Sequence, residues 1–224
     1  MAILIYFQGN AGNLYLRKDK LFQLLSLVKP HFPLKIVAYH LSGYGDSDGK
    51  SNEYELKKDA LLVYDTVKKE IIENNVNDYK LIIYGHSLGA AVSLHLSSQR
   101  KVDGLILENG ISSIEGMVKY MYPRWLPYRY LTKWFLTEKW DGKKAIEEIN
   151  EKKKKKRQAE TEYLFLLSEN DSMVPSTMSK EMFEALESKQ KQFMGFNHAN
   201  HDNIYLQTGY KSEVLNFFKR VMKK

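Results

Sequence analysis

Ser87 lies in a pattern that is typical of a nucleophilic serine. The residues Gly85-His86-Ser87-Leu88-Gly89 have the spacing G-x-S-x-G and follow an apolar run. In a sharp turn from a strand into a helix, this spacing exposes the serine hydroxyl, and glycines flank it because Cβ atoms there would collide with neighbouring backbone. The Leu88 amide, at the start of the helix, could then hold a developing oxyanion. The pattern alone is a weak signal, since it arises by chance in roughly one chain in ten to fifteen of this length.

A nucleophilic serine needs two further residues that this chain also supplies. The hydroxyl is protonated at neutral pH, so attack requires a general base, and the base requires an orienting acid. Asp171 follows the apolar run 163–167, and a loop with two histidines follows the run 192–196. The order Ser87, Asp171, His201 is the nucleophile, acid and base order of α/β-hydrolases. Taken alone, Asp171 would be a turn or capping residue.

Two histidines compete for the role of the base. His201 is favoured because the acid-amide pair Asp202-Asn203 follows it and could cap the next segment and hold the loop. His198 is the alternative. No catalytic role is predicted for the other four histidines, which are His31, His40, His86 and His95.

A second oxyanion donor is predicted in the loop after the first apolar run. Gly9-Asn10-Ala11-Gly12 is small enough for its backbone to approach a reacting carbonyl. We expect the Asn10 amide to donate there, with the Ala11 amide as the alternative. A phosphate-binding loop is the competing interpretation, but its sequence G-x-x-x-x-G-K-[ST] is absent.

Six apolar runs must position these motifs. They alternate with amphipathic segments, which predicts an α/β fold with a mostly parallel, doubly wound sheet covered on both faces. Chemistry collects at the carboxyl ends of the strands in such sheets, and every motif above follows such an end. The predicted strands are 2–7, 35–40, 81–84, 104–107, 163–167 and 192–196, and the predicted helices are 13–29, 52–71, 88–99 and 212–222.

The chain is long enough for one core. With 224 residues and 43% hydrophobic content, we expect 1–224 to form a single domain. Residues 111–160 break the alternation and are predicted to form a small helical cap over the strand ends. The aromatic residues of this segment are Tyr120, Tyr122, Trp125, Tyr128, Tyr130, Trp134, Phe135 and Trp140.

Composition and charge limit which cofactors and binding partners are expected. The chain has no cysteine and no close histidine spacing, so we expect no thiolate chemistry, no metal and no cofactor. No apolar run approaches the roughly 20 residues needed to span a bilayer. The net charge is +7, but six consecutive basic residues, from Lys152 to Arg157, supply most of it, so nucleic-acid binding is not expected. This block is interpreted as a solvated helix extension, with contact to anionic lipid head groups as the alternative.

Five motifs together resemble one family. They are Phe7-Gln8-Gly9-Asn10-Ala11-Gly12-Asn13, Ser42-Gly43-Tyr44-Gly45-Asp46-Ser47, Gly85-His86-Ser87-Leu88-Gly89-Ala90, Asp171-Ser172-Met173-Val174-Pro175 and His201-Asp202-Asn203. In this order they look like the bud-emergence-protein branch of α/β-hydrolases, related to serine aminopeptidase-like hydrolases and to ABHD-type membrane-associated serine hydrolases. The resemblance spans nearly the whole chain. It implies an acyl-transfer hydrolase using Ser87, Asp171 and His201, with esters, lysophospholipids or protein palmitoyl thioesters as substrates, often at membranes.

The chain departs from this family pattern at several points. Gln8 replaces a histidine, Leu41-Ser42 replaces tyrosine-arginine, and Ser168 replaces a glycine. These changes bear on how the oxyanion loop is braced. The first strand corresponds to the third of the usual eight, so we expect the first two strands, and any membrane anchor before them, to be missing. Either the chain is a truncated product or its sheet has an exposed edge at 35–40.

Two functions follow from these observations. The first is a serine hydrolase that attacks an ester or thioester carbonyl through Ser87, forms an acyl-enzyme and releases it with water activated by His201; peptidase activity is less favoured. We expect a monomer with a small or lipid-like acyl substrate, in the cytoplasm or at a membrane surface. The alternative is a hydrolase-like fold that has lost activity and serves as a binding or membrane-scaffold module. The sequence does not identify the natural substrate.

Overall fold

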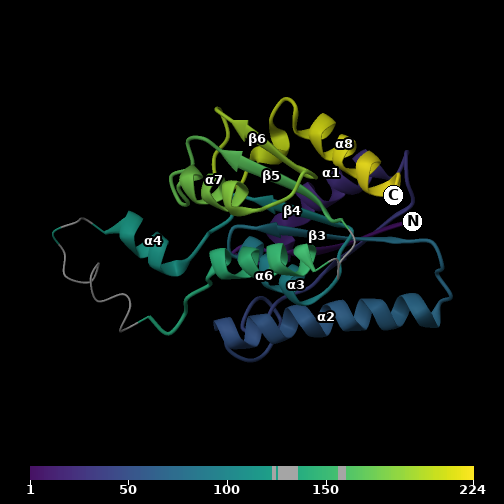
Figure 1. Ribbon diagram of the computed structural model, residues 1–224, viewed down its shortest axis with the longest axis horizontal. Helices are drawn as coiled ribbons and strands as arrows, with labels where there is room; N and C mark the ends of the chain where they lie inside the picture. Colours follow the sequence, from purple (N-terminus) through teal and green to yellow (C-terminus); the bar gives the residue numbers. More distant parts are fainter. Residues whose placement is uncertain (123–124, 126–135, 156–159) are drawn as a thin grey trace.

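A six-stranded sheet forms the centre of the computed structural model, which describes residues 1–122, 125, 136–155 and 160–224. The strand order is β2-β1-β3-β4-β5-β6, and every neighbouring pair is parallel (Figure 1). The parallel α/β fold predicted from the sequence is therefore confirmed. The strands are β1 (Ala2–Phe7), β2 (Leu34–Ala38), β3 (Lys80–His86), β4 (Gly104–Glu108), β5 (Glu162–Ser168) and β6 (Lys191–Phe196).

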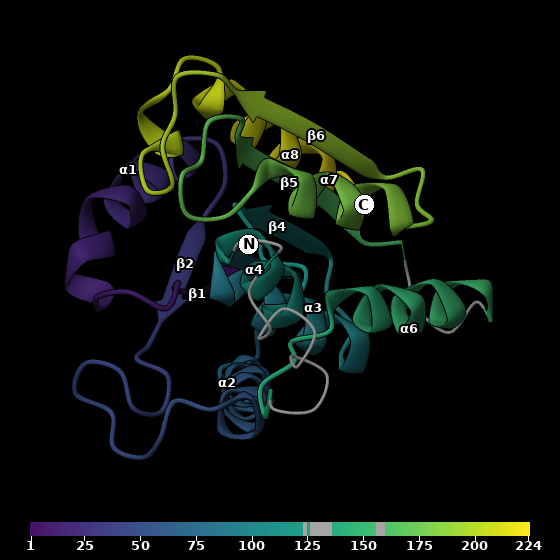
Figure 2. The same ribbon diagram turned by 90° about the vertical axis from the view of Figure 1, so that its left-hand side faces the viewer.

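The strands are apolar because both faces of the sheet are covered. All six residues of β1 are buried. Since successive side chains point to opposite faces, Ile5 belongs to one buried cluster and Tyr6 to the other. Helices α2 (Glu53–Glu73), α3 (Leu88–Gln99), α6 (Gly142–Lys154) and α7 (Ser176–Ala185) contribute to the first cluster, and α1 (Lys18–Val28) and α8 (Tyr210–Met222) contribute to the second (Figures 1 and 2).

Two predicted helix starts can be compared with the structure. Asn52 caps α2 as expected, because its side chain accepts a hydrogen bond of 2.9 Å from the Glu55 amide. Asn13 also accepts a bond from an amide, that of Leu16, but it begins the short 3-10 helix η1 (Leu14–Arg17). Helix α1 follows only from Lys18.

The segment predicted as a cap contains two different structures. Helix α4 (Ile114–Met121) stands beyond the strand ends (Figure 1). Helix α6 instead packs against α3 and places Ile146 and Ile149 in the core. A parallel crossover needs a covering helix, and α6 is that helix between β4 and β5. Outside the described residues lie Tyr128, Tyr130, Trp134, Phe135, Lys156 and Arg157.

Helix α7 had no counterpart in the sequence prediction. It begins directly after Pro175 and buries Met178 and Met182, which are four residues apart on one face. A segment of ten residues with so few apolar positions carries a weak periodic signal. Within the described ranges, no helix is both long enough and apolar enough to cross a membrane.

Candidate active site

Ser87 occupies a strained turn between β3 and α3. Its φ of 56° and ψ of −118° are rare for a residue with a side chain. A Cβ atom at Gly85 would lie 2.3 Å from the Gly89 carbonyl oxygen, and one at Gly89 would lie 2.2 Å from the Phe7 carbonyl oxygen. The collisions inferred from the sequence are thus present. The Ser87 amide donates to the Glu108 carbonyl at 2.9 Å, which ties the turn to the end of β4.

Asp171 and His201 are hydrogen-bonded to each other in this structure. The distance between His201 Nδ1 and Asp171 Oδ2 is 2.7 Å, and both residues are buried. Asp171 Oδ1 also accepts the amides of Met173 and Val174, at 2.8 and 3.0 Å. The competing histidine, His198, is exposed.

The surroundings of Asp171 favour the carboxylate form. Burial by itself would raise its pKa, but hydrogen bonds from the His201 ring and from two backbone amides outweigh burial and lower the pKa below the usual value. The carboxylate is therefore present throughout the neutral range, where it can stabilise a protonated His201.

The loop that carries His201 is held by side chains from three strand ends. The His201 carbonyl accepts a bond of 2.9 Å from His86 Nε2 and one of 2.8 Å from Asn109 Nδ2. Ser168, which replaces the family's glycine, donates to the Asn200 carbonyl at 2.7 Å. The serine at this position thus contributes to positioning the loop.

The residues that follow His201 help to hold its loop, but Asn203 does not cap the next segment, because it makes no capping hydrogen bond at the start of the 3-10 helix η2 (Ile204–Leu206). Asn203 Oδ1 accepts the Asn200 amide at 2.7 Å. Asn200 Oδ1 in turn accepts the Asp202 amide at 3.1 Å. These local bonds fix the turn in which His201 stands.

His86 lies directly against His201, with the two ring centroids 4.9 Å apart. Burial is the main cause that holds the pKa of His86 well below its usual value, and the positive charge of Lys20 adds to it. The folded protein therefore keeps His86 neutral where an unfolded chain protonates this residue, below about pH 6.5.

This difference makes the free energy of unfolding depend on pH. Below about pH 6.5 the unfolded state binds one more proton than the folded state, so stability falls as pH falls. The free energy of unfolding of the intact protein should fall between pH 7.5 and pH 5.5. We expect this fall to be smaller by about 1.4 kcal/mol in His86→Gln, as measured by urea denaturation. His31→Gln, at an exposed position, should retain the full loss. An unchanged pH dependence in His86→Gln would contradict this assignment.

The predicted oxyanion loop is braced by residues other than Gln8. The Gln8 side chain is buried, and within the described residues neither of its polar atoms has a hydrogen-bond partner. Asn10 instead accepts a hydrogen bond on its side chain from the Tyr44 hydroxyl. The loop also lies close to the serine turn, since a Cβ atom at Gly9 would be 3.1 Å from Ser87 Cβ.

A cleft of about 860 Å³ opens at these residues, and Ser87, Leu88 and Asn10 all line it. Its walls are mainly apolar and come from α2, from α4 and from the segments after β4 and β5. Their apolar residues are Leu56, Ile111, Ile114, Met117, Val118, Met121, Trp140, Met173 and Val174. The three residues with proposed nucleophilic or oxyanion roles thus share one cleft.

The structure also bears on metal binding and on the basic block Lys152 to Arg157. Among the described residues no three His, Cys, Asp or Glu side chains are grouped so that they could hold a metal ion. The first four lysines of the basic block, 152–155, all have local acceptors around the end of α6. These include the Ser98 carbonyl for Lys152, Ser188 for Lys153, Glu187 for Lys154 and Glu151 for Lys155. Lys154 and Lys155 remain more than half exposed in these pairs, as expected for a solvated helix extension.

Several supporting residues could not be identified from the sequence. Asn109 follows β4 with a φ of 46°, and its side chain links the His201 carbonyl to the Ser168 amide. A single polar residue after a strand gives no indication of such a role. Arg17 and Lys20 belong to an ordinary amphipathic segment, where charged residues are usually solvated. Each forms an ion pair with a residue far away in the sequence, Asp202 and Glu108 respectively.

Comparison with known proteins shows which family the chain belongs to. The model of the prolyl oligopeptidase family matches residues 45–224. The protein bem46 of Schizosaccharomyces pombe is 31% identical over 218 residues, which cover 96% of this chain and 66% of bem46. The lysophosphatidylserine lipase ABHD12 of Danio rerio is 28% identical over 200 residues, covering 84% of this chain and 48% of that protein. The chain thus spans two thirds of the first relative and about half of the second.

Solved structures agree on the fold. Est1E from Butyrivibrio proteoclasticus, in its form with bound ferulic acid, superposes with a TM-score of 0.73 over 100% of this chain and 90% of Est1E, at 13% identity. At this identity the likeness concerns the fold alone. The chain belongs to the prolyl oligopeptidase family and is a hydrolase of the α/β-hydrolase superfamily.

Proposed function

We propose that this protein is a serine hydrolase that cleaves carboxylic esters or thioesters of apolar acyl groups. The observation that carries the proposal is the hydrogen-bonded pair of Asp171 and His201 beside a cleft that Ser87 lines from a strained turn. These three residue types in this chain order are the parts of an acyl-transfer triad.

The reaction proceeds in two steps. His201 accepts the proton of the Ser87 hydroxyl as the serine oxygen attacks the substrate carbonyl, and Asp171 stabilises the resulting imidazolium. The amides of Leu88 and Asn10 stabilise the oxyanion, and the protonated His201 then gives its proton to the departing alcohol or thiol. Water activated by His201 hydrolyses the acyl-enzyme and regenerates Ser87.

The Ser87 side chain and the His201 ring are not hydrogen-bonded to each other in the part of the chain that the structure describes. Their loops are nevertheless adjacent, because His86 precedes Ser87 and its ring lies 4.9 Å from that of His201, tilted by 46°. Catalytic hydrogen bonds of this kind are often long or poorly aligned until the substrate complex forms. The geometry is thus compatible with a base that reaches Ser87 during the reaction.

The cleft supports an apolar acyl group as the substrate. Met117 and Met121 of α4 and Trp140 offer flexible and flat apolar surfaces to a hydrocarbon chain. The zebrafish relative is named for a lysophospholipid, a substrate with one acyl chain. We therefore include lysophospholipids and other esters with one acyl chain in the proposed class.

The competing function is a hydrolase-like binding or scaffold module. It is supported by Gln8, whose buried amide is unpaired within the described residues, and by the lack of a hydrogen bond between Ser87 and His201. Of the other departures, Ser168 helps to hold the base loop. A buried Asp171–His201 pair also has no evident purpose in a module without acyl transfer, which favours the enzyme.

A fluorophosphonate probe tests the proposal directly. The probe reacts with serines that an adjacent base activates, so the intact protein should label and Ser87→Ala should not. Ser26→Ala, at an exposed position on α1, is the matched control and should label fully. Equal labelling of the intact protein and Ser87→Ala would refute the function. Hydrolysis of nitrophenyl esters of increasing acyl length would then define the preferred chain.

A further inference from the structure

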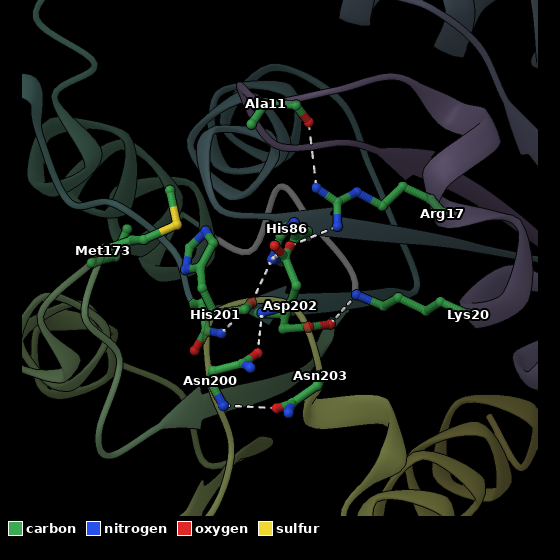
Figure 3. Close-up of polar contacts among 12 residues, drawn as sticks. Ala11, Arg17, Lys20, His86, Met173, Asn200, His201, Asp202 and Asn203 are labelled. Carbon is green, nitrogen blue, oxygen red and sulfur yellow. Dashed lines mark hydrogen bonds and ion pairs between the residues drawn. The ribbon is translucent and has the colours of Figure 1, made fainter.

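One side chain connects the two loops on which the proposed chemistry depends. Arg17 Nη1 lies 2.6 Å from Asp202 Oδ1, and Arg17 Nη2 donates to the Ala11 carbonyl at 3.3 Å. Figure 3 shows the guanidinium between these two partners. Ala11 belongs to the oxyanion loop, and Asp202 directly follows His201. Arg17 itself ends the 3-10 helix η1 and is separated from Asp202 by 185 positions of the sequence.

The contact differs from an ordinary surface ion pair. The Arg17 side chain is only 12% exposed, and its Nε atom is fully buried. The pair between Arg100 and Asp65 has similar distances, but there the arginine side chain is 37% exposed. Fully exposed pairs are screened by water and lose side-chain entropy. Asp202 is 52% exposed, so the ion pair itself reaches the surface, but the buried Nε restrains the guanidinium, which directs its donors in a fixed fork.

The oxyanion loop needs support from outside its own strand. Gln8, at the end of β1, makes no side-chain hydrogen bond within the described residues. Tyr44 binds the Asn10 side chain, and Arg17 binds the next carbonyl along the loop. Of these two supports, the one from Arg17 also contacts the loop of the base.

We propose that Arg17 is a positioning residue that sets the distance between the oxyanion donor of Asn10 and the base His201. This role rests on the proposed function, because both groups must act on one substrate carbonyl. The base loop is already fixed to the sheet through the His201 carbonyl, so Asp202 is a stable anchor for the guanidinium. Through Arg17 the anchor restrains the Ala11 carbonyl, and with it the Asn10 amide one residue earlier.

The expected effect of losing this restraint is on turnover. A misplacement of about 1 Å from a residue outside the chemistry can cost about 10²-fold in rate. We expect Arg17→Met to lower kcat for a nitrophenyl ester by roughly 10- to 100-fold, with KM changed less than about threefold, because the acyl cleft does not include Arg17. The kcat of Arg17→Lys should lie between those of the intact protein and Arg17→Met, since a lysine ammonium keeps the charge but cannot reproduce the two-pronged geometry of the guanidinium.

Asp202→Asn is the variant less prone to unfolding, because Asp202 is half exposed and its replacement leaves the core intact. It should lower kcat in the same direction but less than Arg17→Met, which also loses the Ala11 contact. Asp202 Oδ1 also lies 3.7 Å from His86 Nε2, but that nitrogen is already bonded to the His201 carbonyl. The nearest partner of Asp202 is the guanidinium, so in the double variant kcat should be close to that of Arg17→Met. Asp65→Asn and Arg100→Met break the comparable pair elsewhere and should each retain kcat within about twofold.

Free guanidinium ion provides a further readout. Added at millimolar concentration, it should restore part of the kcat of Arg17→Met and leave Arg100→Met unchanged. The proposal is overturned if Asp202→Asn has the same kcat as the intact protein, or if the losses in the double variant are additive. Failure of the proposed function would appear differently, as equal activity of the intact protein and Ser87→Ala.

Discussion

Asp171→Asn is expected to lower kcat for ester hydrolysis by about 10⁴-fold with little change in the fold. The amide would still offer an oxygen to the amides of Met173 and Val174, which hold the loop. It would carry no negative charge beside His201 and would favour the wrong tautomer of the ring. The base could then neither accept the Ser87 proton in the required orientation nor be stabilised as a cation.

The measurement is the rate of nitrophenyl ester hydrolysis, with folding checked by circular dichroism. Glu169→Gln is a matched control in the same loop, since Glu169 pairs with Lys180 at 2.7 Å on α7. It should retain kcat within about twofold. A loss of less than tenfold in Asp171→Asn would show that Asp171 does not orient the base.

The largest expected loss of stability is that of Lys20→Met, about 3–5 kcal/mol in the free energy of unfolding. Lys20 and Glu108 form an ion pair in which the side chains are 4% and 0% exposed. The Tyr84 hydroxyl also donates to the same carboxylate oxygen. Without the ammonium group, a buried carboxylate would have no positive partner, and the cost of its desolvation would no longer be offset.

Urea denaturation measures this loss. Lys35→Met is the control, because Lys35 and Glu70 form an exposed pair that should contribute at most about 1 kcal/mol. Replacing both members, in Lys20→Met with Glu108→Leu, should restore stability relative to Lys20→Met alone. If the free energy of unfolding of Lys20→Met is within about 1 kcal/mol of that of the intact protein, the Glu108 side chain is not held as a charged carboxylate.

This ion pair also bears on the proposed active site. The Glu108 side chain is fixed by Lys20, and its backbone carbonyl accepts the Ser87 amide. Partial unfolding around Glu108 would therefore release the strained serine turn. Lys20→Met should accordingly lose activity at lower urea concentrations than the control.

The sequence alone was sufficient to predict the features that depend on local chemistry and on burial. The pattern around Ser87 predicted the turn and its collisions, because the required conformation depends on the glycines themselves. The six apolar runs predicted the parallel sheet, since strands buried on both faces have no polar alternation. Helix α7 was missed because two methionines four residues apart are too weak a periodic signal, and α6 was assigned to the cap because its position against α3 is not encoded locally.

Only the tertiary structure shows which of His198 and His201 contacts Asp171. Both stand in one short loop after β6, and a difference of three residues determines which ring meets Asp171 and which faces solvent. The same holds for the pairs of Arg17 with Asp202 and of Lys20 with Glu108. Their partners come together because the strands return in parallel and place distant loops at one edge of the sheet, and no periodicity within either segment carries that information.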